Sequence, residues 1–209
     1  MNKIVVTAAD INKVLAWRDE HVDLVRSMPL ALSEVEIQCV ESEISITCYR
    51  KERKLKMYIR DSDGLLGHST FVPYDGKMWE RTKTTLPSTL FGSQIQMDAI
   101  TVYSSLMALM AYGKNYPANQ NDRKTATGRA TKKVSKKSTS DVTYIIHSTG
   151  NRVSLVQKGH HASPSCSFTV RGHFRHYKNG KTIWISEYKK GTGDEHHKTY
   201  KISPNRISI

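Results

Sequence analysis

Apolar and polar residues alternate along four stretches in the first half of the chain, and such alternation is typical of strands with one buried face. Short polar links separate the stretches, one of these links contains the turn dipeptide Asp63-Gly64, and Asp75-Gly76 marks a further turn after the last stretch. Because links of hairpin length join consecutive strands, the pattern predicts an antiparallel sheet. The expected strands cover residues 35–40, 44–49, 55–59 and 65–72, with residues 50–53 as a charged hairpin tip.

Two helices are expected to flank this sheet. The first follows Thr7, which forms a capping-box pattern with Asp10, and Pro29 ends it. The second covers residues 93–112 and is apolar on nearly all sides. Such a helix is either a buried core element or an interface, rich in flexible Met side chains, for a homodimer or another partner. Both interpretations remain open from the sequence.

Charge divides the chain more sharply than hydropathy does. The formal net charge is +13, yet residues 1–116 hold 14 basic and 14 acidic side chains, so the whole excess lies beyond them. Residues 117–140 hold 7 basic side chains and 1 acidic one, with a single valine. A segment of this composition cannot bury enough apolar surface to offset its ordering entropy, so it predicts a disordered basic linker.

Residues 141–209 hold 11 basic and 4 acidic side chains and regain the strand pattern. Strands are expected at 142–146 and 152–157, together with a hairpin between 167 and 190. The fold class expected is therefore α+β. An N-terminal helix–antiparallel sheet–helix domain (1–116) precedes the linker (117–140) and a small, basic, all-β C-terminal module (141–209).

A basic excess confined to one half of a chain indicates a polyanionic partner, and nucleic acid is the partner we expect. A surface that only increases solubility is the alternative. A phosphate backbone could order the lysine pairs of the linker, which could equally be a solvated tether. These linker residues are Lys132, Lys133, Lys136 and Lys137.

Three cysteines, an odd number without regular spacing, indicate free thiols and a reducing cytosol. Residues 1–10 have too short an apolar run for a signal peptide, and no run of about 18 apolar residues predicts a membrane span. We therefore expect no membrane partner.

Asn179-Gly180 stands between two alternating runs and predicts a hairpin with a two-residue turn. That turn would pair Arg175 with Trp184 and Arg171 with Tyr188 on one face. The candidate nucleic-acid-binding residues of this face and its ends are Arg171, His173, Arg175, Tyr177, Lys178, Lys181, Trp184, Tyr188 and Lys190.

Guanidinium groups grip phosphates through two donors, while Trp and Tyr rings stack on unpaired bases. The face therefore predicts binding of single-stranded or distorted nucleic acid. The structural alternative is that its Arg–aromatic pairs are cross-strand cation–π contacts that stabilise an exposed sheet.

A ribonuclease active site on the same face is the catalytic alternative. A metal-independent ribonuclease needs a base near the 2′-hydroxyl, for which His173 or His176 is a candidate, and cations such as Arg171, Arg175 and Lys181. The sequence offers no second acid–base partner at a defined spacing, so the chain is expected to be a non-enzyme. No zinc spacing is matched by the remaining ligand-type residues, and we expect no metal or cofactor. Those residues are His160, His161, Cys166, His196 and His197.

The stretch 170–191, with the Lys178-Asn179-Gly180-Lys181 turn, Trp184-Ile185 and Tyr188-Lys189-Lys190-Gly191, resembles a C-terminal module of uncharacterised phage and prophage proteins of Gram-positive bacteria. The likeness covers residues 144–202. It implies a viral or mobile-element protein acting in the cytoplasm of a bacterial host, and it implies no activity.

The function expected from these observations is that of a phage accessory protein that binds nucleic acid and inhibits a host nucleic-acid machine or defence system. Two alternatives stay open. One is the metal-independent ribonuclease, and the other is an inhibitor whose basic face docks on an acidic groove of a host protein.

Overall fold

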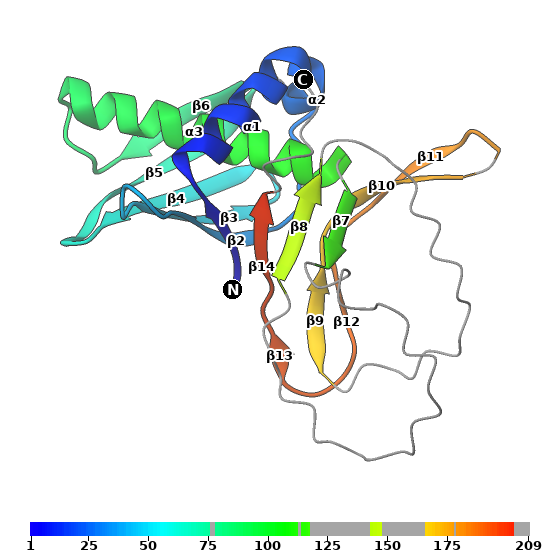
Figure 1. The fold of residues 1–209 in the computed structure, drawn as a ribbon. Coiled ribbons are helices and arrows are strands. Elements are labelled where there is room, and N and C mark those ends of the chain that lie inside the picture. Colours follow the sequence, from blue (N-terminus) through cyan, green and yellow to red (C-terminus); the bar gives the residue numbers. More distant parts are fainter. Residues whose placement is uncertain (76–77, 113, 118–142, 148–165, 178, 203–209) are drawn as a thin grey trace.

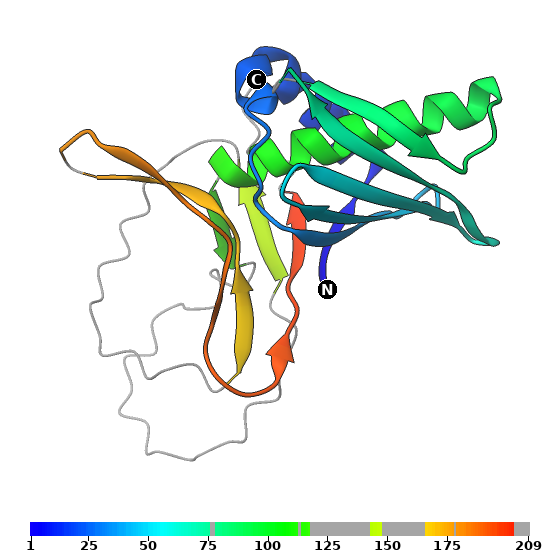
Figure 2. The same ribbon diagram turned by 180° about the vertical axis from the view of Figure 1, so that it is seen from behind.

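The computed structural model describes residues 1–75, 78–112, 114–117, 143–147, 166–177 and 179–202. Its central element is a mixed sheet in the order β6-β5-β4-β3-β2-β1-β14-β8-β7, and three helices cover one face of it (Figures 1 and 2). The expected mixed α+β class is confirmed. The helices are α1 (Ala8–Glu20), α2 (Val22–Arg26) and α3 (Leu90–Tyr112).

The strands predicted in the first half are present with nearly the expected bounds. They are β2 (Glu34–Cys39), β3 (Ser45–Lys51), β4 (Lys54–Asp61) and β5 (Gly64–Tyr74), and the edge strand β6 (Met78–Thr84) follows them. All four consecutive pairs are antiparallel. Apolar and polar residues alternate strictly in β4: Leu55, Met57 and Ile59 are fully buried, while Lys54 and Lys56 are exposed. This alternation explains why β4 forms a strand with one buried face.

The predicted capping box at the first helix is confirmed. Thr7 Oγ1 accepts a hydrogen bond from Asp10 N at 3.1 Å, and Asp10 Oδ2 accepts one from Thr7 N at 3.0 Å. The helix does not continue to Pro29 as expected, since His21 separates α1 from α2.

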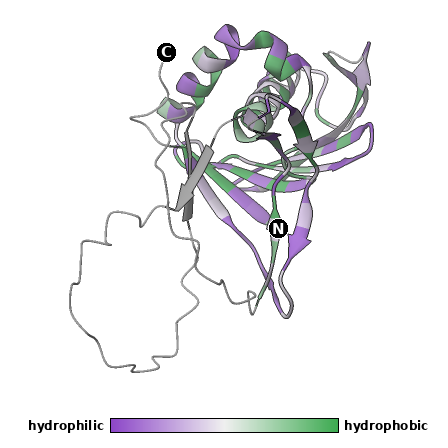
Figure 3. Ribbon diagram, turned by 90° about the vertical axis from the view of Figure 1, so that its right-hand side faces the viewer, coloured by the Kyte–Doolittle hydropathy of each residue, from purple (hydrophilic) through white to green (hydrophobic). Residues whose placement is uncertain are grey.

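The most apolar helix, α3, begins at Leu90 and not at Ser93, and Thr89 Oγ1 accepts a hydrogen bond from Gly92 N at 3.1 Å. Figure 3 shows apolar residues where helices and sheet face each other. Residues 106–111 of α3 are all buried. The large sheet therefore accounts for this helix as a core element, and the homodimer through residues 93–112 stays a prediction.

The C-terminal segment completes the sheet of the N-terminal half. β1 (Asn2–Val6), which the sequence analysis missed, pairs in parallel with β2 on one side and with β14 (Thr199–Ile202) on the other. β14 pairs in parallel with β8 (Thr143–His147), which pairs with β7 (Lys114–Pro117). Strands from both expected parts thus share one sheet, and their independent folding stays a prediction.

Two smaller sheets follow β8. One contains β12 (Tyr188–Lys190), β9 (Ser167–Val170) and β13 (Glu195–His196), and the other contains β10 (His173–His176) and β11 (Thr182–Ile185). The expected long hairpin is therefore divided into two pairs of strands. The expected strand 152–157 and most of the expected linker lie outside the described residues.

The three cysteines are free thiols, as expected, and burial raises the pKa of the Cys48 thiol. Among the described helices, none is long and apolar enough to cross a membrane.

Candidate nucleic-acid interface

The hairpin of β10 and β11, which we call the arm, projects from the body of the molecule (Figure 1). The register expected for it is wrong by one residue. His173 pairs with Ile185, Phe174 with Trp184, and Arg175 with Ile183. The same shift continues in the neighbouring pair of strands, where Tyr188 lies opposite Val170.

The turn of the arm explains the shift. Three residues, not two, separate Tyr177 from Lys181, and Tyr177 N donates to Lys181 O at 2.9 Å. Gly180 has φ +80, which suits the left-handed position that closes a three-residue loop. Asn179 Oδ1 accepts a hydrogen bond from Lys181 N at 3.2 Å. Asn179-Gly180 is thus part of a longer turn. Each residue of β11 therefore pairs with a residue of β10 other than the one that the two-residue turn predicted.

The shifted register places Trp184 beside Phe174 and away from Arg175. The two rings lie 4.7 Å apart between centroids, and Phe174 in turn stacks on Tyr112 at the end of α3, also at 4.7 Å. Packing is close here, because a Cβ at Gly172 would lie 2.6 Å from Leu30 O and 2.7 Å from Trp184 Cζ2. Trp184, which was expected to stack on bases, therefore packs on Phe174, and Phe174 connects the arm to the body through Tyr112.

The outer part of the arm is exposed and cationic. Arg175 and Lys181 are exposed, and the Arg175 guanidinium lies 5.5 Å from the centroid of the Tyr177 ring, which is itself 42% exposed. Residues 171–186 contain no Asp or Glu. Arg175, Tyr177 and Lys181 are the residues of the predicted face that the arm brings together.

The root of the arm is held in the body of the protein. Gly172 N donates to Ala31 O at 2.8 Å, and Ser33 N donates to Glu187 Oε2 at 2.7 Å. Burial lowers the pKa of Arg171 to about 10. Arg171 is therefore half-buried at the root of the arm, whereas Arg175 is exposed.

Tyr188 and Lys190, the last residues of the predicted face, lie in β12 and are exposed. Lys189 between them forms an ion pair with Glu195, with Nζ and Oε2 2.9 Å apart. The β9–β12–β13 sheet therefore presents exposed cations beside a carboxylate, unlike the arm.

The ribonuclease alternative gains no partner for its base among the described residues. His173 Nδ1 lies 3.0 Å from Arg171 O, a main-chain carbonyl. No carboxylate is recorded against the imidazole, and the side chain of His176 lies outside the described residues. Within the described ranges the structure gathers no group of three or more His, Cys, Asp or Glu side chains suited to a metal ion.

Several predicted residues lie outside the described residues, so the structure does not place them. They are Lys132, Lys133, Lys136, Lys137 and Lys178, together with the histidines His160 and His161.

A second surface, which the sequence analysis did not single out, lies on the face of the sheet opposite α3. We call it the open sheet face and define it by the outward side chains of β3 to β6. Tyr58 pairs with His68, and Tyr49 lies diagonally next to Tyr58. Its aromatic and basic members are Tyr49, Lys54, Lys56, Tyr58, Arg60, His68 and Lys83.

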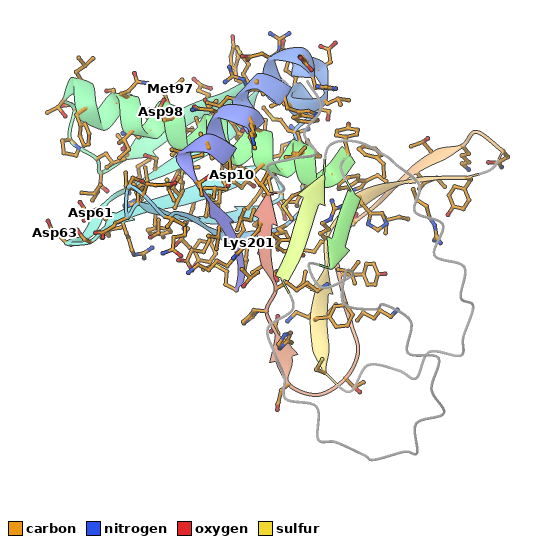
Figure 4. The ribbon with its side chains drawn as sticks, in the orientation of Figure 1. Asp10, Asp61, Asp63, Met97, Asp98 and Lys201 are labelled. Carbon is orange, nitrogen blue, oxygen red and sulfur yellow. The ribbon has the colours of Figure 1, made fainter. Side chains whose placement is uncertain are left out.

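The open sheet face contains a hollow of about 270 Å³. Its lining includes no carboxylate, although the sheet has acidic residues elsewhere. Asp61 and Asp63 lie at the tip of the β4–β5 hairpin, away from the centre of the sheet (Figure 4). The hollow is lined by Lys54, Lys56, Tyr58, His68, Thr70, Thr82 and Lys83.

The sequence does carry a signal for this surface. In residues 54–60, Lys, Lys, Tyr and Arg alternate with Leu, Met and Ile. Since side chains alternate across a strand, burying the apolar set places the other four on one open face. The contribution of His68 depends on the pairing of β4 with β5, which has a bulge at Ile59/Arg60.

Comparisons of this chain with protein-family models, with curated proteins and with solved structures found no match.

Proposed function

We propose that this protein binds nucleic acid and that the arm contributes cations for the phosphate backbone. The observation that carries the proposal is a projecting hairpin whose exposed Arg175 and Lys181 have no carboxylate within residues 171–186. A β-ribbon with this charge can enter a groove or follow a backbone, because its cations are not neutralised within the ribbon.

The charge of the whole chain supports the same proposal. The excess of +13 arises entirely beyond residue 116, in the part of the sequence that includes the arm. Long-range attraction by such an asymmetric charge accelerates encounter with a polyanion. The phage setting and the bacterial cytoplasm follow from the resemblance of residues 144–202, and inhibition of a host nucleic-acid machine is the use expected in that setting. All three stay predictions.

The test is the salt dependence of binding to short fluorescent oligonucleotides, followed by anisotropy with the full-length chain. Each lost phosphate contact should reduce the slope of log affinity against log salt by about 0.7 for single strands. The double variant Arg175→Ala/Lys181→Ala should therefore flatten the slope by about 1.4. Arg26→Ala is the control for the loss of an exposed positive charge outside the arm, because Arg26 is exposed on α2.

The same experiment separates the alternatives. Wild-type protein that binds no oligonucleotide at low salt would contradict the proposal and favour the protein-binding inhibitor. Cleavage of RNA in the presence of a chelator, abolished by His173→Ala, would instead establish the ribonuclease. Neither result is expected.

A further inference from the structure

The open sheet face combines aromatic rings with cations on the side of β3–β5 opposite the described helices (Figures 1 and 2). The rings of Tyr58 and His68 lie 5.6 Å apart between centroids with an interplanar angle of 31°, so their faces point in similar directions. Tyr49 approaches Tyr58 edge-on at 5.9 Å and is 40% exposed. Three ring-bearing residues thus run across three adjacent strands.

Neighbouring side chains fix this surface in place. Thr85 Oγ1 lies 3.0 Å from His68 Nδ1, which orients the imidazole ring. Arg60 donates to Thr47 Oγ1 at 2.9 Å and its guanidinium lies 5.8 Å from the centroid of the Tyr58 ring. A ligand would therefore meet side chains whose rotamers are already restricted, which lowers the entropy cost of binding.

Charge varies across the sheet in a direction that would orient a polyanion. Lys54, Lys56 and Lys83 line the hollow beside the rings. On the opposite side of Tyr49, β2 presents Glu34 and Glu36. A phosphate backbone is thus attracted toward the hollow. On β2, Glu34 opposes it, whereas Glu36 forms an ion pair with Lys3, with Nζ and Oε1 3.6 Å apart.

From this arrangement we infer that the open sheet face is a binding site for single-stranded nucleic acid. Unpaired bases stack on Tyr58 and His68, and Lys54, Lys56 and Lys83 contact the adjoining phosphates. Only an unpaired strand can present base faces to a flat sheet, since the bases of a duplex are stacked on one another. The inference rests on the proposed function, because it names the class of nucleic acid and assigns the bases to a surface other than the arm.

The experiment compares two single-stranded probes of equal length, oligothymidine and an abasic strand with the same phosphates. The wild-type chain should bind oligothymidine more tightly than the abasic strand. Tyr58→Ala should weaken oligothymidine binding about tenfold, the effect of losing one or two stacked bases, and should leave abasic binding nearly unchanged. Tyr58→Leu keeps apolar bulk on the sheet without an aromatic face and should give the same result.

Two matched controls lie on elements that cover the other side of the sheet. Phe91→Ala removes an exposed ring from α3 and should leave both affinities unchanged. Arg26→Ala removes one positive charge from α2, whereas Lys56→Ala removes one from the hollow. Only Lys56→Ala should weaken binding of both probes and flatten the salt dependence.

The outcomes separate this inference from the proposed function. Equal losses for both probes in Tyr58→Ala, or no loss in either tyrosine variant, would overturn the single-strand site. If the single-strand site were overturned but Arg175→Ala/Lys181→Ala still weakened binding, nucleic-acid binding through the arm would remain supported. A wild-type chain that binds neither probe would reject both.

Discussion

The arm and the open sheet face both carry aromatic and basic residues, yet they use their rings in opposite ways. In the arm, Trp184 packs on Phe174 and Phe174 packs on Tyr112, and the exposed cations lie farther out. On the open sheet face, Tyr58 and His68 have only cations and hydroxyl-bearing residues around their hollow. Residue type alone does not separate a structural ring from a binding ring, because the neighbouring element decides which faces remain accessible.

The arm and the sheet face therefore differ in what a substitution should do. Loss of a ring in the arm should act on the free energy of unfolding. Loss of a ring on the sheet face should act on affinity. Four stability measurements sharpen this contrast.

The largest effect is expected for Trp184→Ala. Replacing a fully buried Trp or Phe by Ala costs about 3–5 kcal/mol, and Trp184 is only partly buried, so its loss should lower the free energy of unfolding by about 2 kcal/mol. Urea unfolding measures this change. An unchanged midpoint together with a large loss of affinity would show that Trp184 is a binding ring, as the two-residue turn had predicted.

Gly172→Ala should also destabilise the protein, because a Cβ would meet the main-chain oxygen of Leu30 at 2.6 Å and the Trp184 ring at 2.7 Å. Overpacking of this kind costs about 1–3 kcal/mol. Gly180→Ala is a useful comparison: its Cβ would meet nothing within 4 Å, so only the backbone cost of φ +80 remains. Equal stability of Gly172→Ala and wild type would mean that the root of the arm does not pack as described.

Tyr58→Ala should lower the free energy of unfolding by no more than about 1 kcal/mol, the usual value of a cross-strand pair on a solvated face. Thermal unfolding checks the value. Destabilisation as large as that of Trp184→Ala would make Tyr58 a structural ring and would remove the contrast between the two regions.

The last effect is confined to alkaline pH and concerns Lys198, whose ammonium lies 4.2 Å from the centroid of the Phe168 ring. Burial, assisted by the charge of Arg171, lowers the pKa of Lys198 to about 8. An unfolded lysine has a pKa of about 10.4, so between about pH 8 and 10.4 the unfolded chain binds more protons. The contribution of Lys198 to the free energy of unfolding should therefore rise with pH in this window.

The variant Lys198→Met should flatten this rise, and Lys201→Met, at an exposed lysine of β14, should not. Chemical unfolding at a series of pH values measures the difference. A profile of Lys198→Met that is parallel to wild type would contradict the burial of this cation.

The sequence predicts the antiparallel half of the fold well because its signals are local. Alternation in 55–59 and the Asp63-Gly64 turn specify β4, β5 and their link without reference to the rest of the chain. The pairing of β1 with β14 joins residues near opposite ends of the chain, for example Ile4 and Tyr200, and no local pattern encodes it.

The same distinction between local and long-range signals applies to the candidate site. The cations of β4 could be assigned to one face from alternation alone, whereas the arm required the number of residues in its turn. Asn179-Gly180 fits both a two-residue and a three-residue loop, and one additional residue changes every cross-strand partner. Trp184 was assigned to a binding face for this reason.

Photo-crosslinking tests whether unpaired bases lie on the open sheet face, because it reports where bases lie on the full-length protein. A single strand containing 5-iodouracil is irradiated with the protein, and the linked peptides are identified by mass spectrometry. Crosslinks are expected on the peptides of β4 and β5 that contain Tyr58 and His68, and they should be lost in the presence of excess oligothymidine but not of the abasic strand. Crosslinks confined to Trp184 and Tyr188, or absent altogether from β3–β5, would contradict a base-binding site on the open sheet face.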